Sequence, residues 1–213
     1  MLLFVALVLG AAFDVRYINL ASRTDRLAQI QSEFARQGGV QAERIAGREA
    51  ERRTAAAGAL ACTQSHVDAV RSITADVGLI AEDDCKFVRA LPAGELRQPS
   101  FRWDALMLAY NGPFNHTDCV GRTGARWCRV ISMQTCSLYA VRRAYVPHLL
   151  RVWNTSVSGL ARGGPPSRFA GDQTWKELQR TPGHNWFAAV PRVAVQRPGF
   201  SNIEGSWKNY GVR

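Results

Sequence analysis

The sequence lacks the patterns that identify several classes of protein. It has no CxxC pair, its cysteine spacings are not those of a zinc site, and no segment repeats elsewhere in the chain. No Ser/His/Asp or Cys/His arrangement indicates a nucleophilic enzyme. No block of like charges and no basic helix or aromatic–basic motif indicates nucleic-acid binding. What remains is a chain of 213 residues, enough for one sizeable domain with its own core.

Acidic residues are the scarcer charged type. Lys and Arg together number 27 and Asp and Glu 17, which gives a formal net charge of +10 and a pI near 10.0. Such a charge favours a negatively charged partner, whether nucleic acid, an anionic surface or a phosphorylated small molecule. The alternative is a charge that serves solubility alone. The three consecutive acids Glu82, Asp83 and Asp84 are unexpected here, because adjacent carboxylates repel one another.

The sequence has no hydrophobic run long enough to span a bilayer. Residues 1–12 are apolar but too short for a transmembrane helix, and the basic residues that usually precede a signal-peptide core are missing. We predict that residues 1–12 form a signal peptide or a short hydrophobic anchor, and that residues 13–213 form one domain. The alternative is that the apolar segment is a buried strand of the fold.

The cysteines and sequons bear on the compartment. The chain has five cysteines, so at least one is unpaired within it. Cys119 and Cys128 flank a short loop, and a disulfide between them is consistent with an oxidising compartment. Glycosylation sequons begin at Asn115 and Asn154. We therefore expect the lumen of the secretory pathway (endoplasmic reticulum or Golgi) or secretion, and the cytoplasm if residues 1–12 are not a signal.

Predicted strands alternate with predicted helices through the first half of the chain. Leu27, Ile30 and Phe34 recur at helical spacing, and apolar residues of a second helix do the same. This pattern predicts an α/β fold, a single domain with a mostly parallel central sheet flanked by helices. Ligands of such sheets bind at the carboxyl ends of the strands. The predicted strands span residues 15–20, 42–47, 77–84 and 103–111, and the predicted helices span 22–38 and 58–73.

The second half of the chain gives a less regular pattern. We expect Pro147 to open or kink a helix and Asp172 to cap a short helix. In the first half of the chain, we expect Ser22 or Thr24 to cap the first helix. The segments are a loop that can hold a hairpin (112–129), helices (141–154 and 172–180), one or two last strands (187–196) and an irregular tail (199–213).

The acid triplet is the first candidate site. Side chains alternate in an extended segment, so Glu82 and Asp84 are expected on one side and Asp83 on the other. Two carboxylates on one side suit Mg²⁺ or Mn²⁺, which also binds substrate phosphates. The cation would cancel the repulsion between the acids. The alternative is a helix N-cap or a solvated turn that holds no ligand.

Arginine, serine and histidine side chains supply further candidates. Arg23 and Arg26 follow the first strand, where guanidinium groups suit phosphate or carboxylate; the alternative is an ordinary helix surface with Asp25 as local partner. Ser65 and His66 lie within the second predicted helix. A lone histidine is most often structural, and His66 contacts a polar ligand only if its face points into the cleft.

Asp172 is the last candidate, at the polar start of a late helix that follows a Gly/Pro-rich loop. One interpretation is a simple helix cap. The other is a carboxylate that deprotonates an acceptor hydroxyl as a general base.

These segments, in this order, resemble glycosyltransferase family 25, which includes bacterial lipooligosaccharide galactosyltransferases and animal procollagen galactosyltransferases. The family's opening strand with its Arg-x-Asp-Arg is similar to YINLASRTDR, its Gly-Cys-x-x-Ser-His helix to GALACTQSH, and its strand ending in Glu-Asp-Asp to GLIAEDD. Later segments of the family resemble WDALMLAY, SLYAVRRAYVPHLL, GDQTWKELQ and VAVQRPGFSNIEG. The resemblance covers residues 15–205, and the sequence departs from the family pattern at Ala21, Ser22 and Ala61.

The resemblance implies a GT-A-like fold and an inverting transfer of a hexose, galactose or glucose, from a UDP-sugar to a glycan or protein hydroxyl. By position, Glu82 and Asp84 would hold Mn²⁺ (or Mg²⁺) at the donor diphosphate, and Asp172 would activate the acceptor. The implied partners are UDP-galactose or UDP-glucose and a glycan or protein acceptor, with no nucleic acid and no stable transmembrane span. The implied donor-binding residues are Arg23, Arg26, Ser65, His66 and Asp83.

Two other functions remain open from the sequence. The first is a non-catalytic secreted relative that binds sugars or acts in adhesion, which the departures at Ala21, Ser22 and Ala61 allow. The second is a basic nucleic-acid-binding domain, which predicts binding that weakens steeply with salt. The lack of a nucleic-acid motif argues against the second.

Overall fold

The computed structural model describes residues 13–38, 40–52, 54–97, 101–111, 114–120, 126–203 and 205–209. The predicted signal or anchor at residues 1–12 lies outside them. So do residues 112, 113 and 121–125 of the predicted loop. No helix among the described residues combines the length and the hydrophobicity needed to cross a bilayer.

Strands and helices alternate along the chain, as the periodicity predicted. The strands are β1 (Asp14–Asn19), β2 (Glu43–Ala46), β3 (Val77–Glu82), β4 (Cys85–Phe87), β5 (Ala105–Met107), β6 (Asn115–Val120), β7 (Arg126–Ser132), β8 (Leu138–Arg142), β9 (Trp186–Val190), β10 (Ala194–Gln196), β11 (Gly199–Ser201) and β12 (Ser206–Lys208). The helices are α1 (Thr24–Ala35), α2 (Ala55–Arg71), α3 (Ala93–Arg97), the 3₁₀ turn η1 (Arg143–Tyr145), α4 (Val146–Ala161), α5 (Pro166–Phe169), α6 (Gly171–Thr174) and α7 (Lys176–Arg180).

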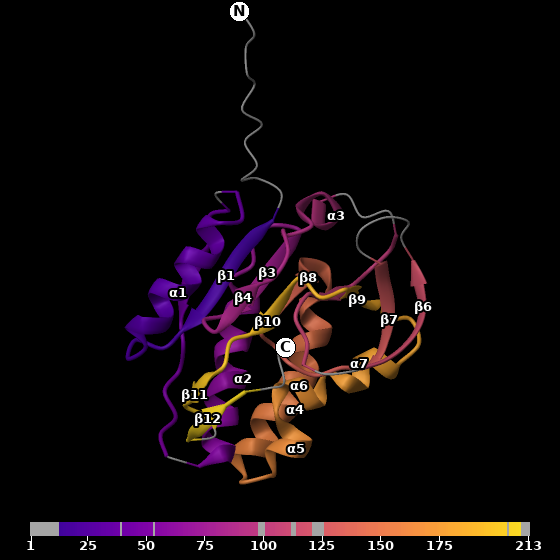
Figure 1. The fold of residues 1–213 in the computed structure, drawn as a ribbon. Helices are drawn as coiled ribbons and strands as arrows, with labels where there is room; N and C mark the ends of the chain where they lie inside the picture. Colours follow the sequence, from indigo (N-terminus) through magenta and orange to yellow (C-terminus); the bar gives the residue numbers. More distant parts are fainter. Residues whose placement is uncertain are drawn as a thin grey trace, which may run out of the picture.

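One large sheet organises the domain (Figure 1), with strand order β2-β1-β3-β8-β5-β9-β7-β6. The pairs β1–β2, β1–β3 and β5–β9 are parallel. Strand β8 runs antiparallel to both β3 and β5, and the hairpin β6–β7 continues antiparallel beyond β9. The α/β single-domain class is confirmed. The sheet is mixed, and its parallel order is concentrated where β1, β2 and β3 bring their carboxyl ends to one edge.

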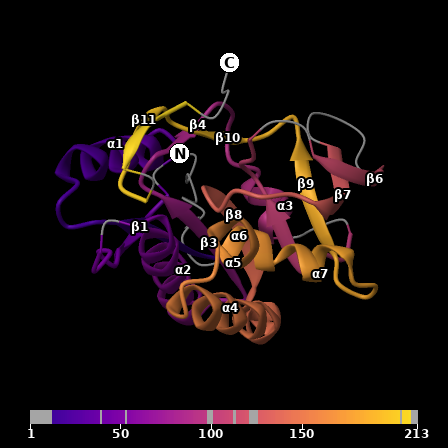
Figure 2. The ribbon, with the colours of Figure 1, turned by 90° about the horizontal axis from the view of Figure 1, so that it is seen from below.

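The two faces of the sheet bury two apolar clusters, because side chains alternate along each strand. On β3, Ile80 packs with α2, α4 and α7, whereas Leu79 and Ala81 pack on the other face with α1 and α3. Figure 2 shows α2 and α4 on one side of the sheet and the β4–β10 ribbon on the other. Burial on both faces makes the central strands apolar throughout, which is typical of α/β domains.

The ends of two helices differ from the prediction. Helix α1 has Arg23 at its N-cap with no side-chain cap, and the hydroxyl of Ser22 instead bonds Glu49 at 2.7 Å. Asp172 is not a cap either, since Ala170 precedes α6 and Asp172 is its second residue. In both cases the predicted capping side chain has a distant partner, Glu49 for Ser22 and Thr135 for Asp172, which a local capping rule does not take into account.

Strand β8 and the hairpin β11–β12 were not predicted. Leu138 to Val141 form an unbroken apolar run that is buried on both faces, and such a run cannot be told from the start of a helix by periodicity. Pro147 opens α4, in its first turn, as expected. The tail that was predicted to be irregular folds back as β11 and β12, which pair with each other.

The disulfide between Cys119 and Cys128 is present and joins β6 to β7. The other three cysteines are free thiols: Cys85 and Cys136 are buried, and Cys62 is partly exposed.

Candidate functional site

The acid triplet lies where β3 ends. Glu82 is the last residue of β3, the chain turns at Asp83 and Asp84, and β4 begins at Cys85. The predicted alternation of the three side chains is wrong, because it assumed an extended segment. The turn places Asp83 and Asp84 together on one partner and leaves Glu82 with a different set of contacts.

Asp83 and Asp84 share one guanidinium group. Arg26 Nη1 donates to Asp83 Oδ1 at 3.0 Å and to Asp84 Oδ2 at 3.1 Å. Asn19, at the end of β1, donates to Asp83 Oδ2 at 2.8 Å, and Gln196 on β10 donates to Asp84 Oδ2 at 3.2 Å. One positive charge therefore faces two buried carboxylates, and this side of the turn keeps a net negative charge when both are ionised.

Glu82 faces helix α2 instead. His66 Nε2 lies 3.2 Å from Glu82 Oε1, and the thiol of Cys62 lies 3.7 Å from the same oxygen. Ser137 donates its hydroxyl to Glu82 Oε2 at 3.1 Å. The other ring nitrogen of His66, Nδ1, lies 3.1 Å from the buried hydroxyl of Tyr139. These contacts fix both the carboxylate and the imidazole.

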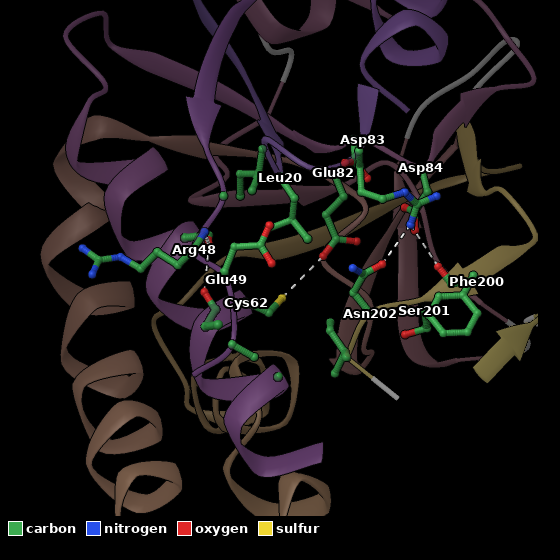
Figure 3. Close-up of a pocket in the computed structure, with 18 of the residues that line it drawn as sticks. Leu20, Arg48, Glu49, Cys62, Glu82, Asp83, Asp84, Phe200, Ser201 and Asn202 are labelled. Atoms are coloured by element: carbon green, nitrogen blue, oxygen red, sulfur yellow. Dashed lines mark hydrogen bonds between the residues drawn. The ribbon is translucent and has the colours of Figure 1, made fainter. Parts of the chain in front are cut away.

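A cavity of about 660 Å³ opens at this edge of the sheet. Figure 3 shows Glu82, Asp83 and Asp84 along one side of it, Cys62 and Arg48 on a second, and Phe200 to Asn202 on a third. Seven of the eight predicted site residues line this cavity, from three separate parts of the chain. They are Arg23, Arg26, Ser65, His66, Glu82, Asp83 and Asp84.

The hairpin β11–β12 covers part of the cavity and is held by the two predicted arginines. The backbone oxygen of Phe200 accepts from Arg23 Nη1 at 3.2 Å and from Arg26 Nη2 at 2.8 Å. Arg23 also donates to Asn202 Oδ1 at 2.9 Å. On the opposite side, a Cβ at Gly58 of α2 would come within 2.8 Å of the backbone of Ile203. The hairpin therefore packs closely on the start of α2.

Ser65 has a structural contact in addition to its place in the cavity. Its hydroxyl donates to Ala61 O at 2.8 Å and accepts from the backbone N–H of Arg48 at 2.8 Å. It thereby ties the loop after β2 to α2. A contact of Ser65 with the donor stays a prediction.

Asp172 does not line the cavity. Its Oδ2 accepts the backbone N–H of Thr135 at 3.1 Å, and Gln173 Nε2 donates to its Oδ1 at 3.1 Å.

Thr135 has a φ of 93°, a costly conformation for a residue with a branched Cβ. The same short segment holds both acids, since Thr135 binds Asp172 and Ser137 binds Glu82. Asp172 is close enough for the charge of Glu82 to raise its pKa, although burial is the larger cause.

The neighbouring acids differ in pKa. Burial raises the pKa of Asp84 to about 7, and the negative charge of Glu82 adds to that effect. The pKa of Asp83 is raised as well, mainly by burial and against the hydrogen bond from Asn19. Burial also acts on Glu82, but the hydrogen bond and charge of His66 and the bond from Ser137 outweigh it, so the pKa of Glu82 is lowered.

One oxygen of the acid turn is left without a partner. Among the described residues, Asp84 Oδ1 is buried and accepts no hydrogen bond. A buried acceptor of this kind costs about 1–3 kcal/mol, and a hard cation would satisfy it. Asp84 therefore fits Mn²⁺ or Mg²⁺. The three acids do not gather their oxygens around one point in the described parts of the chain, so Glu82 as a second ligand remains a prediction.

Several site residues were missed by sequence reasoning. Asn19, Gln196 and Ser137 each donate to one of the three acids, and Cys62 faces Glu82. Asn19, Cys62 and Gln196 lie in segments that resemble the glycosyltransferase family, so their position was a usable signal. Ser137 begins another such segment, SLYAVRRAYVPHLL, but the strand β8 that directly follows it was not predicted.

Comparisons with known proteins bear on the fold. No family model matches the chain, and no curated protein sequence is significantly similar to it. Among solved structures, it is similar to a glycosyltransferase involved in the glycosylation of the major capsid of PBCV-1, with a TM-score of 0.50, 11% identity, and coverage of 86% of this chain and 93% of that one. A mannose-1-phosphate geranyltransferase from Thermus thermophilus matches at a TM-score of 0.33 and 12% identity, over 85% of this chain and 58% of that one, which is too low to carry an argument. At these identities the likeness is one of fold, and the chain has the α/β, GT-A-like fold of a glycosyltransferase.

Proposed function

We propose that this protein is a glycosyltransferase that moves a hexose from a nucleotide-sugar donor to a hydroxyl group. The observation that carries the proposal is the meeting of basic side chains and a buried acid turn in one cavity, at the carboxyl ends of the parallel strands β1 and β3. The basic side chains suit the phosphates of the donor, and the acid turn suits a divalent cation. The fold shared with a glycosyltransferase supports the proposal.

The cavity suits a donor of nucleotide-sugar size. Its volume of about 660 Å³ lies within the usual range for small-molecule sites. Arg48, Arg52 and Lys208 line it in addition to Arg23 and Arg26. A cleft lined by basic side chains attracts an anionic ligand, and the net positive charge of the chain favours the same kind of ligand. The resemblance to family 25 is the support for UDP-galactose or UDP-glucose as the donor.

Mn²⁺ (or Mg²⁺) is proposed at Asp84, with Glu82 as a further ligand. The ion, when bound, stabilises negative charge that develops on the leaving diphosphate. Arg26 and Asn19 hold the carboxylates of the turn in place through the contacts at 2.8–3.1 Å described above. Arg23 and Arg26 both line the cavity, and the charge of Arg23 is shared with Asp25, which it bonds at 2.9 Å.

Asp172 is proposed as the base that takes the proton of the acceptor hydroxyl. One-step inversion needs a base on the side of the sugar ring opposite the leaving group. Asp172 lies outside the donor cavity, and a separate polar group surrounds it. Lys176 Nζ lies 3.0 Å from Gln134 Oε1 and 2.7 Å from Gln173 Oε1. These three side chains can bind the hydroxyl groups of a glycan or protein acceptor, and action in the secretory lumen agrees with the disulfide.

The first experiment is a thermal-shift screen of nucleotide sugars with and without Mn²⁺. Selective stabilisation by one UDP-sugar, larger with Mn²⁺, is the expected result. No shift with any donor would contradict the proposal. A shift without turnover on any acceptor would favour the non-catalytic, sugar-binding alternative.

The second experiment replaces the unsatisfied acid. Asp84→Asn is expected to lower the rate of Mn²⁺-supported transfer or donor hydrolysis by about 10²–10³, the usual cost of losing one group that stabilises developing charge. The matched control is Asp76→Asn, because the side chain of Asp76 is 90% exposed and Asp76 lies just before β3, at the end opposite the turn. Equal activity and equal metal dependence of the two variants would contradict the metal role. Asp172→Asn is expected to keep the donor-induced shift and lose transfer.

A further inference from the structure

A cluster of softer ligands lies beside the acid turn. Cys62 and His66 are four residues apart on α2 and therefore share one helix face. Glu82 meets them from the end of β3, and one ligand atom of each residue lies within 4.8 Å of the other two. The only other such group in the described parts of the chain contains Cys119 and Cys128, whose sulfurs are bonded to each other and offer no thiolate.

Two of the three separations are close to the edges of a zinc tetrahedron. With a Zn–S bond of about 2.3 Å and Zn–N and Zn–O bonds of about 2.0 Å, ligand atoms around zinc lie about 3.3–3.5 Å apart. The observed separations are 3.7 Å from Cys62 Sγ to Glu82 Oε1 and 3.2 Å from His66 Nε2 to the same oxygen. The ligand atoms of Cys62 and His66 lie within 4.8 Å of each other, so a zinc ion would at most draw these two side chains closer together.

His66 and Glu82 are each held in orientation by a hydrogen bond at their other polar atom. His66 Nδ1 contacts the hydroxyl of Tyr139 at 3.1 Å, which can accept the ring proton when Nε2 binds a metal. Ser137 holds the second oxygen of Glu82 at 3.1 Å and leaves Oε1 toward Cys62 and His66. The ring of His66 also packs against Trp153, with ring centroids 5.9 Å apart. Such outer contacts are typical of histidine and carboxylate ligands of metals.

We propose that Cys62, His66 and Glu82 form a Zn²⁺ site whose fourth position faces the cavity. A thiolate and an imidazole prefer Zn²⁺ over Mn²⁺ or Mg²⁺, so the site is distinct in chemistry from the hard-cation position at Asp84. All three side chains line the cavity, so an exchangeable ligand or water can complete the coordination. The cysteine spacing did not indicate this site, because the third ligand comes from a different element.

The site has a regulatory consequence that rests on the proposed function. Glu82 is shared between the two metal positions, so Zn²⁺ at Cys62 and His66 withdraws it from the cation at the donor diphosphate. Zn²⁺ is then an inhibitor of Mn²⁺-supported transfer. The measurable quantity is the ratio of activity with and without Zn²⁺, and this ratio is expected to move toward one in Cys62→Ser.

The test of the site itself needs no turnover. The full chain, with its disulfide intact and stripped by a chelator, is titrated with Co²⁺ and then with Zn²⁺. A thiolate-to-cobalt absorption band is expected, and Zn²⁺ should abolish it by displacing Co²⁺. Cys62→Ser is expected to lose the band and more than about 100-fold in Zn²⁺ affinity, beyond the 10–100-fold effect of outer-shell changes. Mg²⁺ should not displace Co²⁺.

Two control variants separate this site from its surroundings. Cys136→Ser removes a buried free thiol outside the cluster, and Asp84→Asn removes the hard-cation ligand. Both are expected to keep the cobalt band. Absence of the band in the wild type, or its survival in Cys62→Ser, would overturn the proposal. Because no donor is present, this outcome is independent of whether the protein is a glycosyltransferase.

A measurement on the wild type covers the case in which Cys62→Ser does not fold. Cys62 is the one free cysteine that is not buried, so iodoacetamide should alkylate it first in the native protein. Zn²⁺ is expected to protect Cys62 from alkylation, whereas Mg²⁺ is not. Equal alkylation of Cys62 with and without saturating Zn²⁺ would count against the site.

Discussion

The two sides of the acid turn are adjacent in sequence and unlike in surroundings. Glu82 ends a strand and faces a histidine, a thiol and a hydroxyl, and its pKa is lowered. Asp84 lies two residues later in a turn, shares a single arginine with Asp83 and has a pKa raised to about 7. The pKa of Asp84 is raised by burial and by the charge of its neighbour Glu82, whereas the contacts with His66 and Ser137 lower the pKa of Glu82. The same difference in surroundings underlies our two metal proposals, Zn²⁺ beside Glu82 and a hard cation at Asp84.

The largest effect on stability is expected from the removal of Arg26. Arg26→Ala leaves Asp83 and Asp84 buried without their shared cation, and we expect a loss of about 3–5 kcal/mol in the free energy of unfolding, as for other broken buried pairs. The contacts of Glu82 do not involve Arg26 and should persist. Denaturant unfolding in the presence of a chelator measures the loss.

Added Mn²⁺ should stabilise Arg26→Ala more than it stabilises the wild type, because the variant has lost the competing cation. The matched control is Arg143→Ala, since Arg143 pairs with the exposed Asp76 at 3.7 Å and should lose about 1 kcal/mol or less, the value of a surface pair. Equal losses in Arg26→Ala and Arg143→Ala would break the comparison.

The pH dependence of stability is the next test. The pKa of Asp84 is raised from 3.8 to about 7 in the folded protein, so between these pH values the folded state binds more protons than the unfolded state. The stability that Asp84 contributes is therefore present below about pH 4 and is lost as the pH rises through about 7. Asp84→Asn should lack this loss.

The measurement is Tm against pH in chelator for the wild type and Asp84→Asn. The variant's gain over the wild type should be larger at about pH 8 than at about pH 5. A constant difference in Tm across this range would show that Asp84 titrates normally.

The smallest expected effect concerns the other side of the turn. Ser137→Ala removes one hydrogen bond to Glu82 Oε2, which should lower the free energy of unfolding by about 1.5–3 kcal/mol if the acceptor is ionised. If Glu82 were neutral, the loss should fall to about 1 kcal/mol. Thr181→Ala is a control, because its hydroxyl makes a local, exposed bond within its own helix end. A loss no larger than that of the control would mean that Glu82 is not held as described.

The first part of the fold could be predicted from the sequence, because its signals are local. From β1 to β3, strands alternate with two helices whose apolar residues recur with a 3.6-residue period. Each of these elements was predicted close to its observed position. Strand β8 could not be found this way, since its residues are apolar on both faces and lead directly into a helix. Its antiparallel direction is set by its neighbours β3 and β5.

The sequence could predict most of the residues that form the candidate site, but not the contacts between them. The sequence predicted that Arg26, Asp83 and Asp84 lie at one edge of the sheet, because each of them follows the end of a strand. It did not reveal that Arg26 bridges the two aspartates, or that Gln196 approaches from a residue 112 positions away. Asp172 was placed in the same site by analogy, and the structure puts it outside the cavity, because Thr135 and Gln173 hold its carboxylate.

The close approach of Ile203 to Gly58 has a consequence for the order in which the protein assembles. The bonds that hold the hairpin join residues 174 to 179 positions apart, so they close very long loops and are expected to form after the sheet. The hairpin's own side chains add little burial, since Trp207 is 71% exposed and Phe200 48% exposed. A segment of this kind unfolds locally while the sheet stays intact. We therefore expect the cavity to be completed late in folding and to open again by local unfolding of the hairpin, which would give a ligand a route of entry and exit.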